Sequence, residues 1–140
     1  MVEYDNFLMS LKRLEEQYEN YTELDVALPR LLRAAVAESV IQRFEICYGY
    51  DRLWKVLKRY LVEELGVADS PNGPKPVFRL AFENDLIPAP VERWLDYADR
   101  RVDTARACSG EKARAALEIV GGFIEDAAGL YRTMSGRSWE

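Results

Sequence analysis

The sequence predicts an all-α protein, an up-and-down four-helix bundle with one short extra helix in the connection between the second and third long helices. Two observations predict this fold. Apolar residues recur at alternating three- and four-residue steps along four long segments, and no segment shows the strict alternation of a half-buried strand. A chain of 140 residues can bury a core of its own. We therefore expect a single domain over 1–140 with a frayed tail at about 135–140.

The first helix is expected to begin at Asp5, a candidate N-cap, and to end within 22–28. One stripe of this segment is apolar or aromatic and comprises Phe7, Leu11, Leu14, Tyr18 and Tyr21. This stripe is therefore expected to face the bundle core.

The second helix is expected to run without interruption over about 29–65, from Pro29 in its first turn to a stop at Gly66. Its middle part, 41–61, is apolar or aromatic on most of its circumference, so we expect other helices to cover it on more than one side. Asp51 falls within the apolar arc, where a carboxylate is costly without a partner.

The rest of the chain alternates loops and helices. Residues 66–76 are rich in proline and glycine and predict a loop, which a short helix follows at about 76–84. The last two long helices are expected at about 91–107 and about 111–134. The apolar stripe of the final helix comprises Ala113, Leu117, Val120, Ile124, Ala127, Tyr131 and Met134.

The chain contains no histidine. Histidine is the commonest general base near neutral pH and the commonest metal ligand, so Ser–His and Cys–His pairs and histidine-containing zinc or di-iron sites are excluded. A magnesium site made of carboxylates alone stays open, but the sequence has neither a P-loop nor a tight Asp-x-Asp cluster. We therefore expect no catalytic residue, no metal and no cofactor.

Charge and composition restrict the partners and the location. The net charge of −5 argues against an extended nucleic-acid surface, but it permits a nucleotide or an acidic partner in a local basic pocket. No apolar run approaches the roughly 18 residues of a membrane-spanning helix, and the charged N-terminus does not resemble a signal peptide. Cys47 and Cys108 are isolated and are expected to be reduced thiols. These features predict a cytoplasmic protein.

Four charged residues are the candidates for binding a ligand or a partner: Asp51, Arg101, Asp103 and Arg106. Asp51 could pair with a lysine of its own helix, or it could receive Arg101 or Arg106 from the helix at 91–107. Guanidinium groups suit phosphate and carboxylate ligands. The two arginines lie roughly 140° apart on one helix, so they converge only if the helix ends between them or a second protomer supplies the other wall.

Aromatic residues are unusually dense in 41–61, where Phe44, Tyr48 and Trp54 stand out. They could form bundle core, contact a second copy of the chain or stack on a base. Because one side of a helix needs fewer aromatics, we expect a homodimer through this region.

The same segments resemble the nucleotidyltransferase substrate-binding proteins of the HEPN superfamily. The resemblance covers about 33–131 and is carried by this ordered set: IQRFE at 41–45, DRLWKVLKRYL at 51–61, Ser70-Pro71, VFRLAF at 77–82, Leu86-Ile87 and Trp94. It implies an all-α bundle, commonly dimeric, that works with a separate minimal nucleotidyltransferase, often as a toxin–antitoxin pair.

The resemblance also implies an Arg-x4-His motif late in the fourth helix, here the one at about 91–107, frequently followed by x-Tyr, which active HEPN ribonucleases use. Arg101 matches the arginine of the motif, but Arg106 stands at the histidine position and Cys108 at the tyrosine position. Val102 replaces the polar residue that usually follows the arginine. Arginine stays protonated near neutral pH and cannot act as a general base.

The resemblance and the altered motif together predict a non-catalytic substrate-binding or partner subunit of a two-component nucleotidyltransferase system. A ribonuclease toxin with an altered active site and a purely structural dimeric module are the alternatives.

Overall fold

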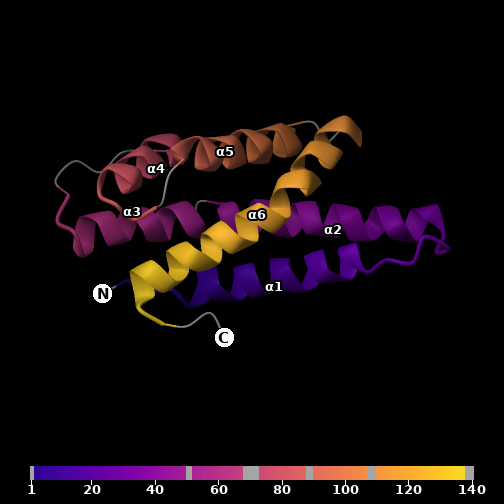
Figure 1. The fold of residues 1–140 in the computed structure, drawn as a ribbon, viewed down its shortest axis with the longest axis horizontal. Coiled ribbons are helices and arrows are strands. Elements are labelled where there is room, and N and C mark those ends of the chain that lie inside the picture. The colour runs from indigo at the N-terminus through magenta and orange to yellow at the C-terminus, as the bar shows by residue number, and fades with distance from the viewer. Residues whose placement is uncertain (1, 50–51, 68–72, 88–89, 107–109, 138–140) are drawn as a thin grey trace.

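The protein is all-α, as predicted. The structure, a computed structural model, describes residues 2–49, 52–67, 73–87, 90–106 and 110–137, with the backbone alone at 104–106 and 110. These residues form six helices and no strand (Figure 1): α1 (Asp5–Thr22), α2 (Arg30–Tyr48), α3 (Leu53–Glu63), α4 (Pro74–Glu83), α5 (Val91–Arg106) and α6 (Gly110–Ser135). None of the six is long and apolar enough to cross a membrane.

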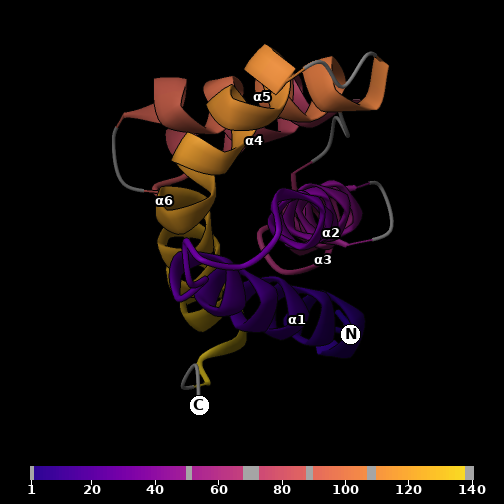
Figure 2. The same cartoon turned by 90° about the vertical axis from the view of Figure 1, so that its right-hand side faces the viewer.

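The helices form the predicted bundle, with the short α4 as the extra helix. α1 and α2 make an antiparallel hairpin, and α6 crosses it diagonally with contacts to both (Figure 1). α5 packs against α2 and α6, while α4 packs against α3 and α5. Figures 1 and 2 show α3 nearly in line with α2, so α2 and α3 together occupy the second long position of the bundle.

The prediction of one uninterrupted helix over 29–65 is wrong, because the helix breaks between Tyr48 and Leu53. Gly49 caps α2 with an extended ψ of 175°, and Arg52 precedes α3 with φ −123° and ψ −103°. Glycine supports a helix poorly, so a break at Gly49 costs less than at its apolar neighbours. The buried stripe does not continue in phase across the break: Phe44 of α2 and Leu53 of α3 are both completely buried, although they would lie about 180° apart on an unbroken helix.

The start of α1 also differs from its prediction. Asp5 is the first helical residue, not the N-cap; the cap position is Tyr4, which makes no side-chain capping hydrogen bond. A carboxylate in the first turn still interacts favourably with the positive end of the helix. The other boundaries lie within two residues of expectation, and Gly66 follows α3 with a left-handed φ of 70°.

An aromatic cluster from four helices fills the centre of the core. The Phe44 ring of α2 meets the Phe123 ring of α6 edge to face, with ring centroids 5.0 Å apart. Phe78 of α4 stacks on Trp94 of α5 at the same centroid distance. Tyr48 contacts Phe44, Phe78 and Phe123. α4 and α5 therefore cover the aromatic surface of α2, which the sequence had assigned in part to a dimer contact.

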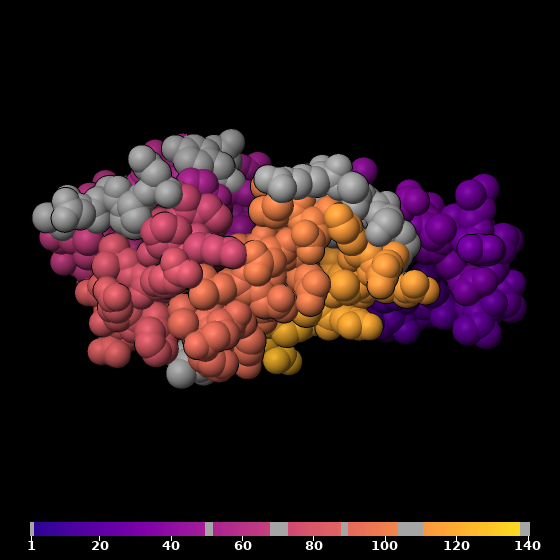
Figure 3. All heavy atoms as spheres, turned by 90° about the horizontal axis from the view of Figure 1, so that it is seen from above, coloured from indigo at the N-terminus to yellow at the C-terminus, as the bar shows by residue number. Residues whose placement is uncertain are grey.

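The α1–α2 hairpin extends beyond α5 and α6 at the end that carries its connection (Figures 1 and 3). This overhang, residues 23–34, exposes four large apolar side chains: Val26, Leu28, Leu31 and Leu32. Val26 and Leu31 are 85% and 81% exposed, so no part of the described chain covers them.

Candidate functional site

Arg101 lies at the break between α2 and α3. It is half-buried on α5, and a Cβ atom added to Gly49 would lie 4.0 Å from the Arg101 Nη2 atom. The guanidinium group therefore sits beside the residue that ends α2. The negative end of the α2 dipole, carried by the last carbonyl groups of the helix, favours a cation at this place.

The second residue of this site is Tyr48, which contributes a buried hydroxyl. Its side chain is 1% exposed, and its hydroxyl has no hydrogen-bond partner among the described residues. Burial raises the pKa of Tyr48, the positive charge of Arg101 opposes this shift, and the Asp99 carboxylate adds to it. The hydroxyl is therefore a neutral donor within the electrostatic reach of Arg101.

Asp99 shapes the charge around Arg101 and Tyr48. Its carboxylate forms an ion pair with Lys75 of α4, with an N–O distance of 2.6 Å. Both side chains of the pair are well exposed, so the pair contributes little stability.

Of the predicted charged candidates, only Arg101 has a described position at the break. Asp51 and the motif position Cys108 lie outside the described residues. The backbone of α5 runs unbroken from Arg101 through Arg106, so no helix end brings these two arginines together. Asp103 is partly exposed and lies roughly 200° around α5 from Arg101, so the structure does not bring the two side chains together.

The three predicted aromatic residues separate into two groups. Phe44 and Tyr48 are fully buried in the core of the protomer, which leaves no ring face for a base or a second copy. Trp54 of α3 is partly buried and packs against the edge of the core. Core packing therefore accounts for Phe44 and Tyr48.

A second polar cluster, between α5 and α6, was missed by the sequence analysis. The Asp126 carboxylate accepts hydrogen bonds from the Tyr97 hydroxyl, at 2.5 Å, and from both the Nε and Nη2 atoms of Arg93. Desolvation and the Asp126 carboxylate raise the pKa of Tyr97. The four-residue step from Arg93 to Tyr97 was a usable signal, but nothing in the sequence paired it with Asp126.

The Asp126 cluster borders a pocket of about 380 Å³. Its walls come from α5, α6 and the residues after α4, and include Trp94, Glu125, Asp126 and Arg132. Opposite charges at the pocket rim and the satisfied Asp126 carboxylate are typical of helix pairing, so we assign this cluster to stability.

The described residues offer no nucleophile or metal site. Burial raises the pKa of the Cys47 thiol to about 12, so it stays protonated at neutral pH. Within the described ranges, no group of three or more cysteine, aspartate and glutamate side chains is placed to hold a metal ion.

Comparison with solved structures gives one strong match to the fold. The protein HI0074 from Haemophilus influenzae aligns with a TM-score of 0.82, at 22% sequence identity, over 94% of this chain and 98% of that one. Its structure is described as revealing the fold of a substrate binding domain of a nucleotidyltransferase. Comparison with curated proteins gives no match.

Comparison with protein families extends over nearly the whole chain. The model of the family described as nucleotidyltransferase substrate binding protein like matches residues 2–136, which include every helix described above. This confirms the resemblance stated from the sequence. The chain belongs to the nucleotidyltransferase substrate-binding protein family.

Proposed function

We propose that this protein is the substrate-binding subunit of a separate nucleotidyltransferase and does no chemistry itself. Family membership and the fold shared with HI0074 support the first part. The observation that carries the proposal is the placement of the Arg101 guanidinium near the buried Tyr48 hydroxyl, which has no hydrogen-bond partner among the residues that the structure describes. Both groups donate hydrogen bonds, and neither is a base near neutral pH.

The donor set defines the ligand that the site suits. A guanidinium group and a phenolic hydroxyl favour an acceptor-rich, anionic group such as a phosphate or a carboxylate. Such a group belongs to a nucleotide or to an acidic side chain of the partner enzyme. Arg101 is the more accessible donor of the two, because it is only half-buried whereas the Tyr48 side chain is 1% exposed.

Complex formation tests the proposal. The protein is mixed with the small nucleotidyltransferase encoded beside it, and the mass of the product is measured by light scattering after size exclusion. We expect a stable heteromeric complex that Arg101→Ala weakens. The matched control is Arg100→Ala, which removes an arginine of the same helix that pairs with Asp96 and should leave the complex intact. Failure of the wild-type protein to form any complex would contradict the proposal.

The absence of catalysis has its own test. We expect no cleavage when the purified protein is incubated with RNA, because the chain has no histidine and Arg106 stands where the motif needs a base. Robust cleavage by the wild-type protein that is lost in Arg101→Ala would identify a ribonuclease instead.

The proposal includes a homodimer. Its interface is placed on the overhang and not on the aromatic residues of α2, because these are buried in the core. Leu31 and Val26 form an apolar surface with charges of both signs around it, including Asp25 and Arg30. A two-fold axis brings such a surface against its own copy. Sedimentation equilibrium should show a dimer for the wild type and a monomer for Leu31→Lys. A wild-type monomer at all concentrations would contradict the assignment.

A further inference from the structure

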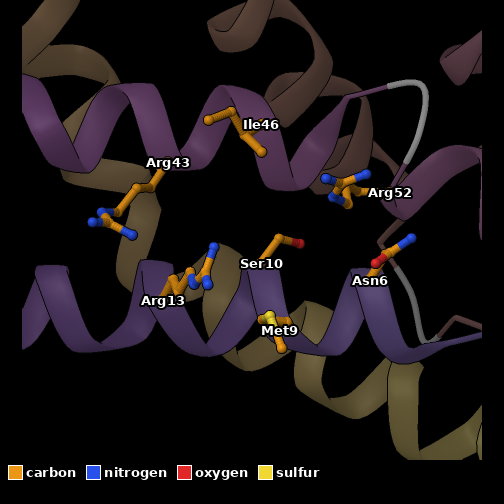
Figure 4. A pocket seen from close by; sticks show the side chains of 7 residues that line it. All are labelled: Asn6, Met9, Ser10, Arg13, Arg43, Ile46 and Arg52. Atoms are coloured by element: carbon orange, nitrogen blue, oxygen red, sulfur yellow. The ribbon is translucent and has the colours of Figure 1, made fainter.

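A groove lined by several arginines lies on the side of α2 that faces away from the aromatic core. It is a groove of about 110 Å³ between α1 and the α2–α3 break, and Figure 4 shows its lining. We call it the arginine groove and define it by these residues: Asn6, Met9, Ser10 and Arg13 of α1, Arg43 and Ile46 of α2, and Arg52.

The break in the second helix creates this groove. On an uninterrupted helix, Arg43 and Arg52 would be nine residues apart and face opposite sides, because nine steps of 100° leave about 180°. The turn at Gly49, in which the Arg52 N–H donates to the Gly49 carbonyl at 3.0 Å, changes the angular position of the residues that follow it, while α3 stays nearly in line with α2. Arg52 consequently lines the same groove as Arg43 and Arg13.

The groove holds three guanidinium groups and no carboxylate among its lining residues. Arg13 and Arg43 make no ion pair or hydrogen bond with any part of the chain that the structure describes. Figure 4 shows both guanidinium groups turned into the space between α1 and α2. Two like charges held across a narrow groove repel each other, and a bound anion removes this repulsion.

The floor and rim of the groove fix its shape. The Ser10 side chain is buried and its hydroxyl donates to the Phe7 carbonyl at 2.8 Å, so the floor is rigid. Met9 and Ile46 are 55% and 56% exposed and form apolar edges. Asn6, at one end, adds a side-chain amide that can donate to an oxyanion.

A second hollow continues the positive charge along α3. It measures about 290 Å³, shares Asn6 and Arg52 with the arginine groove, and adds Lys55 and Arg59. Its single carboxylate, Glu3, accepts a hydrogen bond from the Asp5 backbone N–H. The lining residues of the two hollows together include five basic side chains and one carboxylate, so a ligand with linked phosphates matches their charge better than a single carboxylate does.

We infer that the arginine groove binds a phosphate group of a small polyphosphate ligand, with a second phosphate of the same ligand in the hollow along α3. The groove accommodates one phosphate and not a whole nucleotide, so the rest of the ligand lies outside it. This inference does not rest on the proposed partner enzyme, because its test uses the protein alone.

Calorimetric titration with pyrophosphate at constant ionic strength tests the inference. We expect pyrophosphate and ATP to bind, adenosine not to bind, and the Arg13→Gln/Arg43→Gln double variant to lose about tenfold or more in affinity for both. The control is Arg79→Gln/Arg132→Gln, which changes the net charge equally on α4 and α6 and should bind as the wild type does.

Several outcomes would overturn the inference. They are no binding of either phosphate ligand, an equal loss of affinity in the control variant, or tight binding of a short single-stranded RNA without binding of pyrophosphate. If the double variant does not fold, NMR of the wild-type arginine side chains replaces it. Pyrophosphate should then shift the Arg13, Arg43 and Arg52 signals and leave Arg79 and Arg132 unmoved; the reverse pattern would refute the site.

Discussion

Buried tyrosine hydroxyls in this protein occur in two opposite environments. Tyr97 and Tyr48 are both almost fully buried in the aromatic core. The Tyr97 hydroxyl donates to Asp126, whereas the Tyr48 hydroxyl has no partner among the described residues. An unpaired buried hydroxyl costs about 1–3 kcal/mol, and a bond to a charged acceptor contributes a similar amount of stability. The two residues therefore affect folding with opposite signs.

Replacing each tyrosine with phenylalanine should separate these effects. We expect Tyr48→Phe to raise the free energy of unfolding by about 1 kcal/mol, because it removes the unpaired hydroxyl and keeps the ring contacts. Tyr97→Phe should lower it by about 2 kcal/mol through loss of the bond to Asp126. Urea unfolding without ligand measures both. Destabilisation by Tyr48→Phe would mean that the hydroxyl has a structural partner and is not held for a ligand.

At the scale of elements, two glycines in the interior of α6, Gly121 and Gly129, have different surroundings. A Cβ atom at Gly121 would lie 2.9 Å from the Tyr18 hydroxyl oxygen of α1, closer than real contacts allow. At Gly129 the nearest atom outside the helix backbone is Arg132 Nη2, at 3.9 Å. Gly121 thus permits the close approach of α1 and α6, whereas Gly129 only weakens its helix.

Two alanine substitutions test this difference. We expect Gly129→Ala to stabilise the protein by about 0.8 kcal/mol, the helix propensity of alanine over glycine. Gly121→Ala gains the same propensity but must displace the Tyr18 ring, so it should be no more stable than the wild type. Thermal unfolding compares the two variants. Equal stabilisation by both would show that α1 and α6 are not in close contact at Gly121.

At the scale of the whole molecule, burial makes the fold sensitive to alkaline pH. Burial is the main cause that raises the pKa of Tyr4 and of Cys47, each to about 12. A group whose pKa is raised by folding keeps its proton in the native state and loses it sooner in the unfolded chain. Stability is therefore intact below the unfolded pKa and falls as the pH rises toward the folded one.

Cys47 gives a measurable share of this pH dependence. The reference pKa of its thiol is 9.0. Above that pH the thiol ionises in the unfolded chain but stays protonated in the native protein, so the unfolded state becomes more favourable. Between about pH 8 and about pH 11, the wild type should lose about 2 kcal/mol more than Cys47→Ala. Urea unfolding across this range measures the difference. Parallel pH profiles would show that the native thiol ionises as readily as a free one.

The periodicity of the sequence predicted most of the fold. Three- and four-residue steps located the long helices, because an amphipathic helix must bury one stripe whatever its neighbours are. The core stripe of the first helix illustrates this, since Phe7, Leu11 and Leu14 are completely buried. Gly66 and the segment rich in proline and glycine marked the end of α3, because glycine readily adopts the left-handed backbone conformation that ends a helix.

The sites were less predictable, because each depends on the break at Gly49. Gly49 and the change of phase between the buried residues of α2 and α3 were the local signs of the break, but the apolar residues around most of the circumference of 41–61 concealed them. Arg101 was a candidate from the sequence as a charged residue that matches the family arginine, but its place beside Gly49 and Tyr48 comes from the packing of α5 on α2. The arginine groove was missed, because the wheel of an unbroken helix puts Arg43 and Arg52 on opposite faces.

The sequence by itself determined the helical class, the order of the helices, the family and the absence of histidine, since these depend on residue type and spacing along one chain. The tertiary structure decided which charges meet. It buried Phe44 and Tyr48 under α4 and α5, left the overhang uncovered, and turned Arg52 toward Arg13 and Arg43. The physical reason is that a binding site is made by side chains from different helices, and their approach is set by packing and not by sequence distance.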